Sequence, residues 1–156
     1  MPLWSQRCRY LRKKRRLTLE CDELWSYVGN KRTQCWLWLA LDMQTRLVVG
    51  CAIGPRTDET AQALWESLPP AYRRWAVLYT ELWQSYPKVL PSKRHCAVGK
   101  HTGLTNHVEC LNNTFRQFCA RLVRKTLCFS KKLQNHIGAL WYFIHHYNRQ
   151  CLALSS

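Results

Sequence analysis

The sequence predicts an α/β domain built on a mixed sheet, in which three antiparallel strands come first and a helix, a strand and further helices follow. Three observations lead to this prediction. Strand-like apolar runs at 17–28, 34–42 and 46–53 follow one another with short turns between them. Helical periodicity then alternates with one short β-prone run. Finally, 156 residues with 47% hydrophobic residues suffice for one packed domain.

The three first runs are bounded by residues that favour turns. These signals are Gly-Asn at 29–30, Met-Gln-Thr at 43–45 and Gly-Pro at 54–55. Because each connection is only a few residues long, antiparallel pairing of consecutive strands is the most economical arrangement.

A helix is predicted next, because Thr57 or Asp58 can cap it and apolar residues recur at helical spacing until the Pro-Pro pair at 69–70. The following run, 75–80, is apolar and β-prone, and it indicates a buried strand with Glu81 at its carboxyl end. Ligand sites gather beyond such strand ends in sheets covered by helices. Residues 87–101 are rich in Pro, Lys, Arg and His, and we expect a loop with one short strand at 95–98.

From Thr102 onward the pattern is helical. The expected apolar stripe of the first helix comprises Val108, Leu111, Phe115, Phe118 and Leu122. Glu109 lies on another face, and Arg116 follows it by seven residues, almost two helical turns, so the two side chains point the same way. A last helix is expected to begin near Ser130.

The charge balance points to a polyanionic partner. Twenty-four Lys and Arg stand against nine Asp and Glu, which gives a formal charge of +15, and cations set against phosphates gain affinity by releasing counterions. Residues 1–16 form a basic arm, either a phosphate-binding extension or a linker. No acid follows Glu109, so the last third of the chain presents a positive field. The alternative is a solvated basic surface of the kind found on ribosomal proteins.

Composition also argues against several protein classes. The nine cysteines lack the spacing of a zinc knuckle, and most lie in apolar segments as small core residues would. No apolar run approaches the roughly 20 residues that cross a bilayer, and no signal-peptide core follows the basic start. We therefore expect a cytoplasmic protein with no membrane contact.

Three of the nine acids fall where a fold could bring carboxylates together: Asp22 in the first strand, Glu81 at the end of the fourth and Glu109 on a later helix. This order is that of a ribonuclease-H-like domain. Carboxylates converging from distant segments can hold two Mg²⁺ ions roughly 4 Å apart for phosphoryl displacement, with Asp22 shared by both ions. The alternative for each acid taken singly is a helix cap or an exposed ion-pair partner.

Four stretches carry a resemblance to a known family. They are ECDELWSYVGNKRTQCWLWLALD, RLVVGCAIGPRTDET, YTELWQSY and HVECLNNTFRQFCARLVRKTLCFSKKLQNH. In this order they resemble the catalytic half, or second reading frame, of the insertion-sequence-one family of bacterial DDE-type transposases, over about residues 17–148. The resemblance implies a ribonuclease-H-like catalytic domain over 17–150, preceded by the arm at 1–16.

The resemblance also implies site residues and partners. Asp22, Glu81 and Glu109 take the places of the catalytic acids and bind two Mg²⁺ or Mn²⁺ ions, and His136 occupies a family position from which it would approach the metals. The DNA-contacting cations would be Arg116, Arg121, Arg124, Lys125, Lys131 and Lys132. The implied partners are the terminal inverted repeats, target DNA, further copies of the chain on DNA, and an upstream DNA-binding segment joined by frameshifting, in a bacterial, nucleoid-associated protein.

Two departures from the family pattern keep alternatives open. The family usually has Asp where this chain has Glu81, which is longer by one methylene, and a displaced ligand costs rate where positioning carries catalysis. The zinc and helix-turn-helix segment with which members read their inverted repeats has no counterpart here. The alternatives are a catalytically silent DNA-binding or inhibitory transposase subunit and a nuclease of the same fold.

Overall fold

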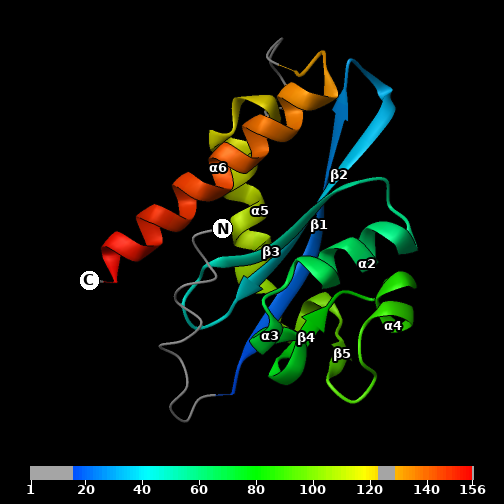
Figure 1. Ribbon diagram of the computed structural model, residues 1–156, viewed down its shortest axis with the longest axis vertical. Helices are drawn as coiled ribbons and strands as arrows, with labels where there is room; N and C mark the ends of the chain where they lie inside the picture. The colour runs from blue at the N-terminus through cyan, green and yellow to red at the C-terminus, as the bar shows by residue number, and fades with distance from the viewer. Residues whose placement is uncertain (1–15, 123–128, 156) are drawn as a thin grey trace.

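A five-stranded mixed sheet lies at the centre of the computed structural model, which describes residues 16–122 and 129–155 (Figure 1). The strand order is β3-β2-β1-β4-β5. The α/β class and the mixed sheet are therefore as the sequence predicts.

The first three strands, β1 (Thr18–Val28), β2 (Asn30–Asp42) and β3 (Val48–Gly54), are antiparallel as predicted. Gly29 forms the first turn with a φ of 74°, a value that glycine adopts without steric cost. In the second turn, Asp42 accepts backbone hydrogen bonds from Gln44 and Thr45 through Oδ1 (2.7 and 3.1 Å).

The short strands β4 (Val77–Thr80) and β5 (His95–Ala97) complete the sheet in parallel with β1. The expected strand at 75–80 begins two residues later, because Pro70 starts the short helix α3 (Pro70–Trp75) and leaves Trp75 67% exposed. Proline suits the first helical position, where its missing N–H has no partner to lose. A second short helix, α4 (Ser85–Val89), overlaps the start of the expected loop.

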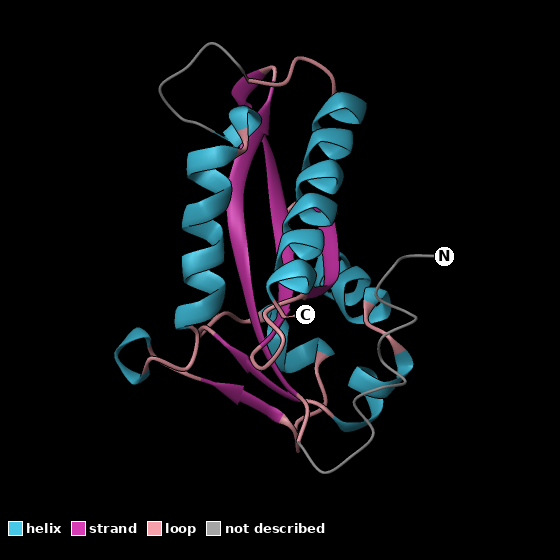
Figure 2. Cartoon of the chain, turned by 90° about the vertical axis from the view of Figure 1, so that its left-hand side faces the viewer, coloured by secondary structure: helices cyan, strands magenta, loops and turns pink. Residues whose placement is uncertain are grey.

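Helices cover both faces of the sheet (Figure 1). On one face α2 (Asp58–Ser67), α3 and α4 pack against a core that includes Leu19, Trp38 and Leu78. On the other face α5 (Asn106–Phe118) and α6 (Leu133–Leu154) pack on a second core around Leu39 and Leu41. Figure 2 shows these two longer helices lying over the strands. Side chains of successive strand residues point to opposite faces, so each long strand supplies both cores.

The α5 side of the molecule differs from the sequence prediction in its boundaries. The turns η1 (Lys100–Thr102) and η2 (Ala120–Leu122) flank α5, which begins at Asn106 rather than near 102. Phe118 is 71% exposed, so the buried stripe of α5 ends at Phe115. Helix α6 begins at Leu133, and Asn148 fastens it to β3 through hydrogen bonds of 2.9 Å to the N–H and C=O of Val48.

Within 16–122 and 129–155, no helix is both long and apolar enough to cross a membrane. The basic arm, up to residue 15, and the expected DNA contacts Arg124 and Lys125 lie outside the described residues.

Candidate functional site

The parallel pairing of β1 with β4 ends where the acids begin. The last paired residues are Cys21 and Thr80. Asp22 is therefore the first residue of β1 beyond the ladder, and Glu81 is the first residue beyond β4. Both residues therefore lie just beyond the carboxyl end of the parallel pairing of β1 with β4, where they line the same cavity.

Helix α5 brings the third acid to the same edge. Asn112 of α5 donates a hydrogen bond from Nδ2 to Asp22 Oδ2 at 2.7 Å. Glu109 lies one turn earlier on the helix and accepts a hydrogen bond from Thr105 Oγ1 at 3.2 Å. Asn112 thus connects β1 directly to the helix that carries Glu109.

A fourth acid, Glu20, fixes the start of α5. It is fully buried, accepts the backbone N–H of Val108 through Oε2 at 2.8 Å and pairs with the ring of His107. Glu20 and Asp22 share one face of β1, since strand side chains alternate. A carboxylate that accepts first-turn N–H groups also suits the positive end of the helix. Burial raises the pKa of Glu20, and the Val108 N–H partly opposes that rise.

These elements enclose a polar cavity of about 240 Å³. Its lining residues are Asp22, Glu23, Arg56, Glu81, Lys100, Glu109, Asn112, Asn113 and Arg116. All three acids singled out from the sequence lie there, and so does Arg116, two turns beyond Glu109.

Asp22 is the electrostatic centre of the cavity. Burial, opposed by a hydrogen bond from the Glu23 backbone and reinforced by the negative charges of Glu23, Glu81 and Glu109, raises the pKa of Asp22 to about 7. Cations offset part of this charge: Lys100 Nζ lies 3.6 Å from Glu81 Oε1. The cavity therefore concentrates negative charge that a bound cation would relieve.

The donors of the cavity are hard oxygens. In the described part of the chain, no three His, Cys, Asp or Glu side chains are grouped closely enough to hold a metal ion as they stand. Asn112 Oδ1, however, is buried and has no hydrogen-bond partner, which is costly unless a ligand satisfies it. Carboxylates beside such an amide oxygen match the preferences of Mg²⁺ and Mn²⁺.

Sequence reasoning missed one pair in this cavity, Glu23 and Arg56. The Glu23 side chain is only 2% exposed, and its Oε1 accepts a hydrogen bond from Arg56 Nε at 3.1 Å and forms an ion pair with Nη2 at 3.0 Å. Its other oxygen, Oε2, accepts the Tyr86 hydroxyl at 3.1 Å. Glu23 itself could have indicated the pair, because an acid within an apolar strand needs a partner for its charge.

Aromatic rings hold the guanidinium of Arg56 in place. Its carbon lies 4.8 Å from the ring centre of Trp36 and 4.7 Å from that of Trp83. Tyr86, whose hydroxyl donates to Glu23, is fully buried. Because both oxygens of Glu23 are engaged, this acid supports Arg56 and is not available as a metal ligand.

His136 does not approach the acids, contrary to the sequence expectation. It is fully buried and lies between Ser26 Oγ (2.9 Å from Nε2) and Ser130 Oγ (3.0 Å from Nδ1). Ser26 is four residues beyond Asp22 on β1, about 13 Å along a strand. Burial and the charge of Arg121 lower the pKa of His136, and its two serine contacts join β1 to the segment before α6.

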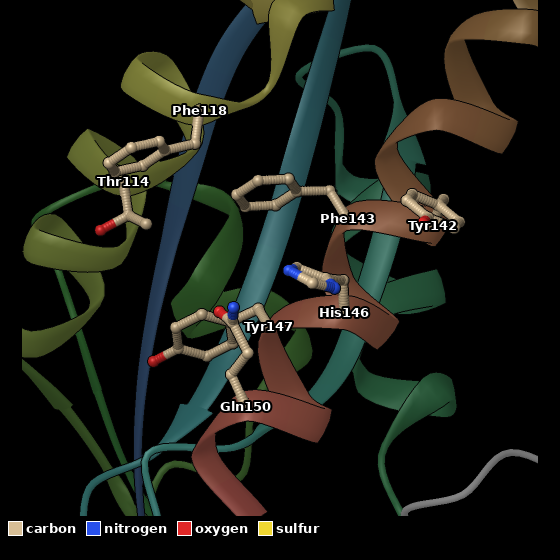
Figure 3. A pocket seen from close by; sticks show the side chains of 7 residues that line it. All are labelled: Thr114, Phe118, Tyr142, Phe143, His146, Tyr147 and Gln150. Carbon is tan, nitrogen blue, oxygen red and sulfur yellow. The ribbon is translucent and has the colours of Figure 1, made fainter. Parts of the chain in front are cut away.

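The expected DNA-contacting cations fall in different places. Arg116 lies in the cavity, whereas Arg121, Lys131 and Lys132 are exposed and do not line it. A larger hollow of about 480 Å³ lies between α5 and α6 (Figure 3). Aromatic side chains such as Phe118 and Tyr142 line it, and no acid does. The acid-lined cavity is therefore the candidate site.

Comparison with known proteins identifies relatives over most of the chain. Residues 16–149 match the protein family described as IS1 transposase. The insertion element iso-IS1n protein InsB of Shigella dysenteriae is 39% identical over 128 residues, which cover 82% of this chain and 94% of that protein. The insertion element IS1 protein InsB of Shigella flexneri is 37% identical over 125 residues, covering 80% and 92%. An IS1 InsB protein of Escherichia coli K12 is 35% identical over 125 residues, covering 80% and 72%.

Proposed function

The chain belongs to the IS1 transposase family, and from this premise we propose that it cleaves DNA at the ends of an insertion sequence and joins the freed ends to target DNA. One observation carries the proposal: Asp22, Glu81 and Glu109, from segments far apart in the sequence, line a single cavity together with Arg116. Carboxylates that converge beside a phosphate-binding cation suit phosphoryl transfer on DNA.

The arrangement of the sheet supports a ribonuclease-H-like, DDE-type assignment. Three antiparallel strands precede a helix and a parallel strand, and the strand order is β3-β2-β1-β4-β5. The acids fall on the central strand β1, just after the neighbouring strand β4, and on α5. This is the order of acids that the family resemblance implies.

The donor set fits two hard divalent cations. Asp22 would be shared by both, Glu81 would hold one and Glu109 the other, with the unpartnered Asn112 Oδ1 as a further ligand. Bound Mg²⁺ or Mn²⁺ would supply an activated oxygen nucleophile and charge compensation for the departing 3′-oxygen.

The protein's own cations have a separate task, which is to hold the DNA backbone over the acids. Arg116 lies two helical turns from Glu109 and can contact a phosphate next to the scissile one. Arg56 is held rigidly by Glu23 and two tryptophans, so little side-chain entropy is lost when it binds a phosphate. The exposed Lys100 would exchange Glu81 for a phosphate when DNA arrives.

A second candidate function is a catalytically silent, DNA-binding subunit that joins transposase oligomers as an inhibitor. Glu81 favours this function, because it is longer than the Asp usual in the family and already pairs with Lys100. A shift of about 1 Å in a metal ligand can cost on the order of 100-fold in rate. A nuclease of the same fold remains the third candidate.

Strand cleavage distinguishes these functions. The chain, fused to an upstream DNA-binding segment, is incubated with element-end DNA in Mg²⁺ or Mn²⁺ beside its Glu81→Asp and Asp22→Ala variants. We expect cut and joined products from the natural chain and none from Asp22→Ala. Activity only in Glu81→Asp would establish the silent subunit, cut ends without joined products would establish the nuclease, and cleavage by Asp22→Ala would refute the metal site.

The proposal extends to partners. Terminal inverted repeats and target DNA are the proposed substrates, and several copies of the chain would assemble on them. An upstream DNA-binding segment, joined by frameshifting, would read the repeats. Such a protein would act at the bacterial nucleoid.

A further inference from the structure

A second cluster of cations lies at the tip of the β1–β2 hairpin, far from the acids. Lys31 and Arg32 open β2, and Lys131 and Lys132 immediately precede α6; all four are exposed. Figure 1 shows the tip of the hairpin and the start of α6 at the same end of the molecule. We refer to these four residues as the tip patch.

Specific contacts hold the two halves of the tip patch together. The N–H of Gly29 donates to the carbonyl of Ser130 at 2.6 Å. The buried His136 bridges Ser130 to Ser26 of β1, and the rings of Tyr27 and Phe129 lie 5.8 Å apart. The four cations therefore stand on a fixed backbone and need little ordering to bind a ligand.

The tip patch lacks compensating charge. No acid occurs between Glu23 and Asp42, and none follows Glu109. In the described part of the chain, the tip patch takes part in no ion pair, whereas the exposed Lys88 pairs with Asp58 at 2.9 Å. Four fixed like charges raise the free energy of the protein until an anion with several spaced charges binds.

The position of the tip patch suggests which anion binds. Seven residues separate Asp22 from Gly29 along β1, about 23 Å at 3.3 Å per strand residue. Each strand of duplex DNA carries one phosphate per roughly 3.4 Å, so this length corresponds to about seven base pairs. We propose that the tip patch is a second contact with the DNA backbone, about seven base pairs from the phosphate held at the acids. The DNA as partner rests on the proposed function.

Salt dependence of binding tests the tip patch without cleavage. The affinity of the full chain for a duplex of about 25 base pairs is measured against salt concentration for R32Q/K131Q/K132Q and for the charge-matched control R74Q/K93Q/R149Q, whose cations are exposed elsewhere. Each neutralised phosphate contributes about 0.9 to the slope of log affinity against log salt. We expect the slope to fall by about 2 to 3 in the tip-patch variant and by less than about 1 in the control.

Equal slopes in the two variants, or a tip-patch slope equal to that of the natural chain, would overturn the inference. Two further variants guard against misfolding: K131Q alone should lower the slope by about 0.9, and R32K/K131R/K132R should preserve it. Asp22→Ala, which tests the proposed function, should keep the full slope while losing cleavage. Cleavage by Asp22→Ala would thus refute the catalytic proposal and leave the tip patch standing.

A second measurement tests the spacing. One uncharged methylphosphonate is placed about seven base pairs from the cleaved phosphate. It should weaken binding of the natural chain about as much as K131Q does, and it should have little effect on R32Q/K131Q/K132Q. An equal loss in both proteins would place the contact elsewhere and overturn the inference.

Discussion

Asp22, for which we propose a metal-binding role, carries a charge that opposes folding. Burial raises its pKa, and together with the charges of three neighbouring carboxylates it brings the pKa to about 7. In the unfolded chain the side chain is hydrated and Glu81 and Glu109 are no longer held beside it, so an aspartate ionises near pH 3.9. Holding this group charged at neutral pH therefore costs folding free energy, and a bound cation would recover that cost.

We expect Asp22→Asn to stabilise the protein. Between pH 4 and 7 the unfolded state releases the Asp22 proton and the folded state keeps it, so stability contributed by the protonated form is lost as pH rises. We expect the variant to gain about 2–4 kcal/mol over the natural chain at pH 8 and nothing near pH 4. Urea unfolding across this range measures it.

Asp58→Asn is the opposite control. Hydrogen bonds from Ser85 and Lys88 lower the pKa of Asp58, so its contribution to stability is present above the unfolded pKa and is lost as pH falls through the folded one. The variant should lose stability at neutral pH. If Asp22→Asn behaved in the same way, the charge repulsion assigned to the cavity would be wrong.

The pair formed by the buried Glu23 and the exposed Arg56 gives a second prediction at this scale. Arg56→Met should cost about 1–3 kcal/mol in unfolding free energy, because it leaves the Glu23 carboxylate buried without a cation. Adding Glu23→Gln should recover part of that loss, and a double-mutant cycle from denaturant unfolding measures the coupling. Lys88→Met, which breaks an exposed pair, should cost under about 1 kcal/mol. Additive effects at 23 and 56 would contradict the pairing.

Among the elements, α5 contributes most to the cavity, because Glu109, Asn112 and Arg116 all line it. Its first turn is held to β1 by the buried Glu20. Removing that carboxylate frees the start of the helix to shift against the sheet, and the residues of the cavity would shift with it.

We expect Glu20→Ala to lower the free energy of unfolding by about 1–3 kcal/mol, since it leaves the buried N–H of Val108 without an acceptor. Under conditions where the protein stays folded, cleavage should fall at least about 10-fold, because Glu109 moves relative to Asp22. Thermal unfolding and a cleavage assay measure the two effects. The exposed Glu66→Ala should change stability by under about 0.5 kcal/mol. Full activity in a folded Glu20→Ala would show that α5 is positioned by other contacts.

The elements also show what the sequence could predict. The long strands and α2 could be predicted from the spacing of apolar residues along the sequence, because each buried position requires an apolar side chain. Helix α3 was not predicted from the sequence. The Pro-Pro pair at 69–70 indicates the end of a helix, but it also begins α3. Asp22, Glu81 and Glu109 could be predicted as site residues, because isolated acids stand out in a strongly basic chain. Glu23 and Arg56 were not predicted, because their pairing depends on β1 and the segment before α2 meeting in space.

For the whole molecule, the cavity draws on β1, on the segments that follow β3 and β4, on η1 and on α5. If a cation binds there as proposed, it would contact β1, the end of β4 and α5 at once. Ligands that bind only the folded state raise its stability by mass action, so metal binding should be visible as a change in melting temperature of the whole domain.

About 10 mM Mg²⁺ should raise the melting temperature by about 3 °C if the dissociation constant is near 1 mM, from a linkage energy of about 1.4 kcal/mol. Asp22→Ala should remove this shift, and Asp58→Ala should keep it. Sodium chloride at matched ionic strength controls for screening. Differential scanning fluorimetry suffices for the measurement, and an equal shift in Asp22→Ala would place the ion elsewhere.

The short ladder between β1 and β4 has one further consequence. Only four residue pairs align these strands, yet this alignment determines which side chains lie beyond the last paired residues and can line the cavity. Inserting a single residue into β4 would turn Glu81 to the opposite face, and a slip by two would carry Asp22 inside the paired region. A few backbone hydrogen bonds between β1 and β4 thus determine which acids line the cavity. An insertion or deletion in β4 could therefore change or abolish the proposed activity while every acid is kept.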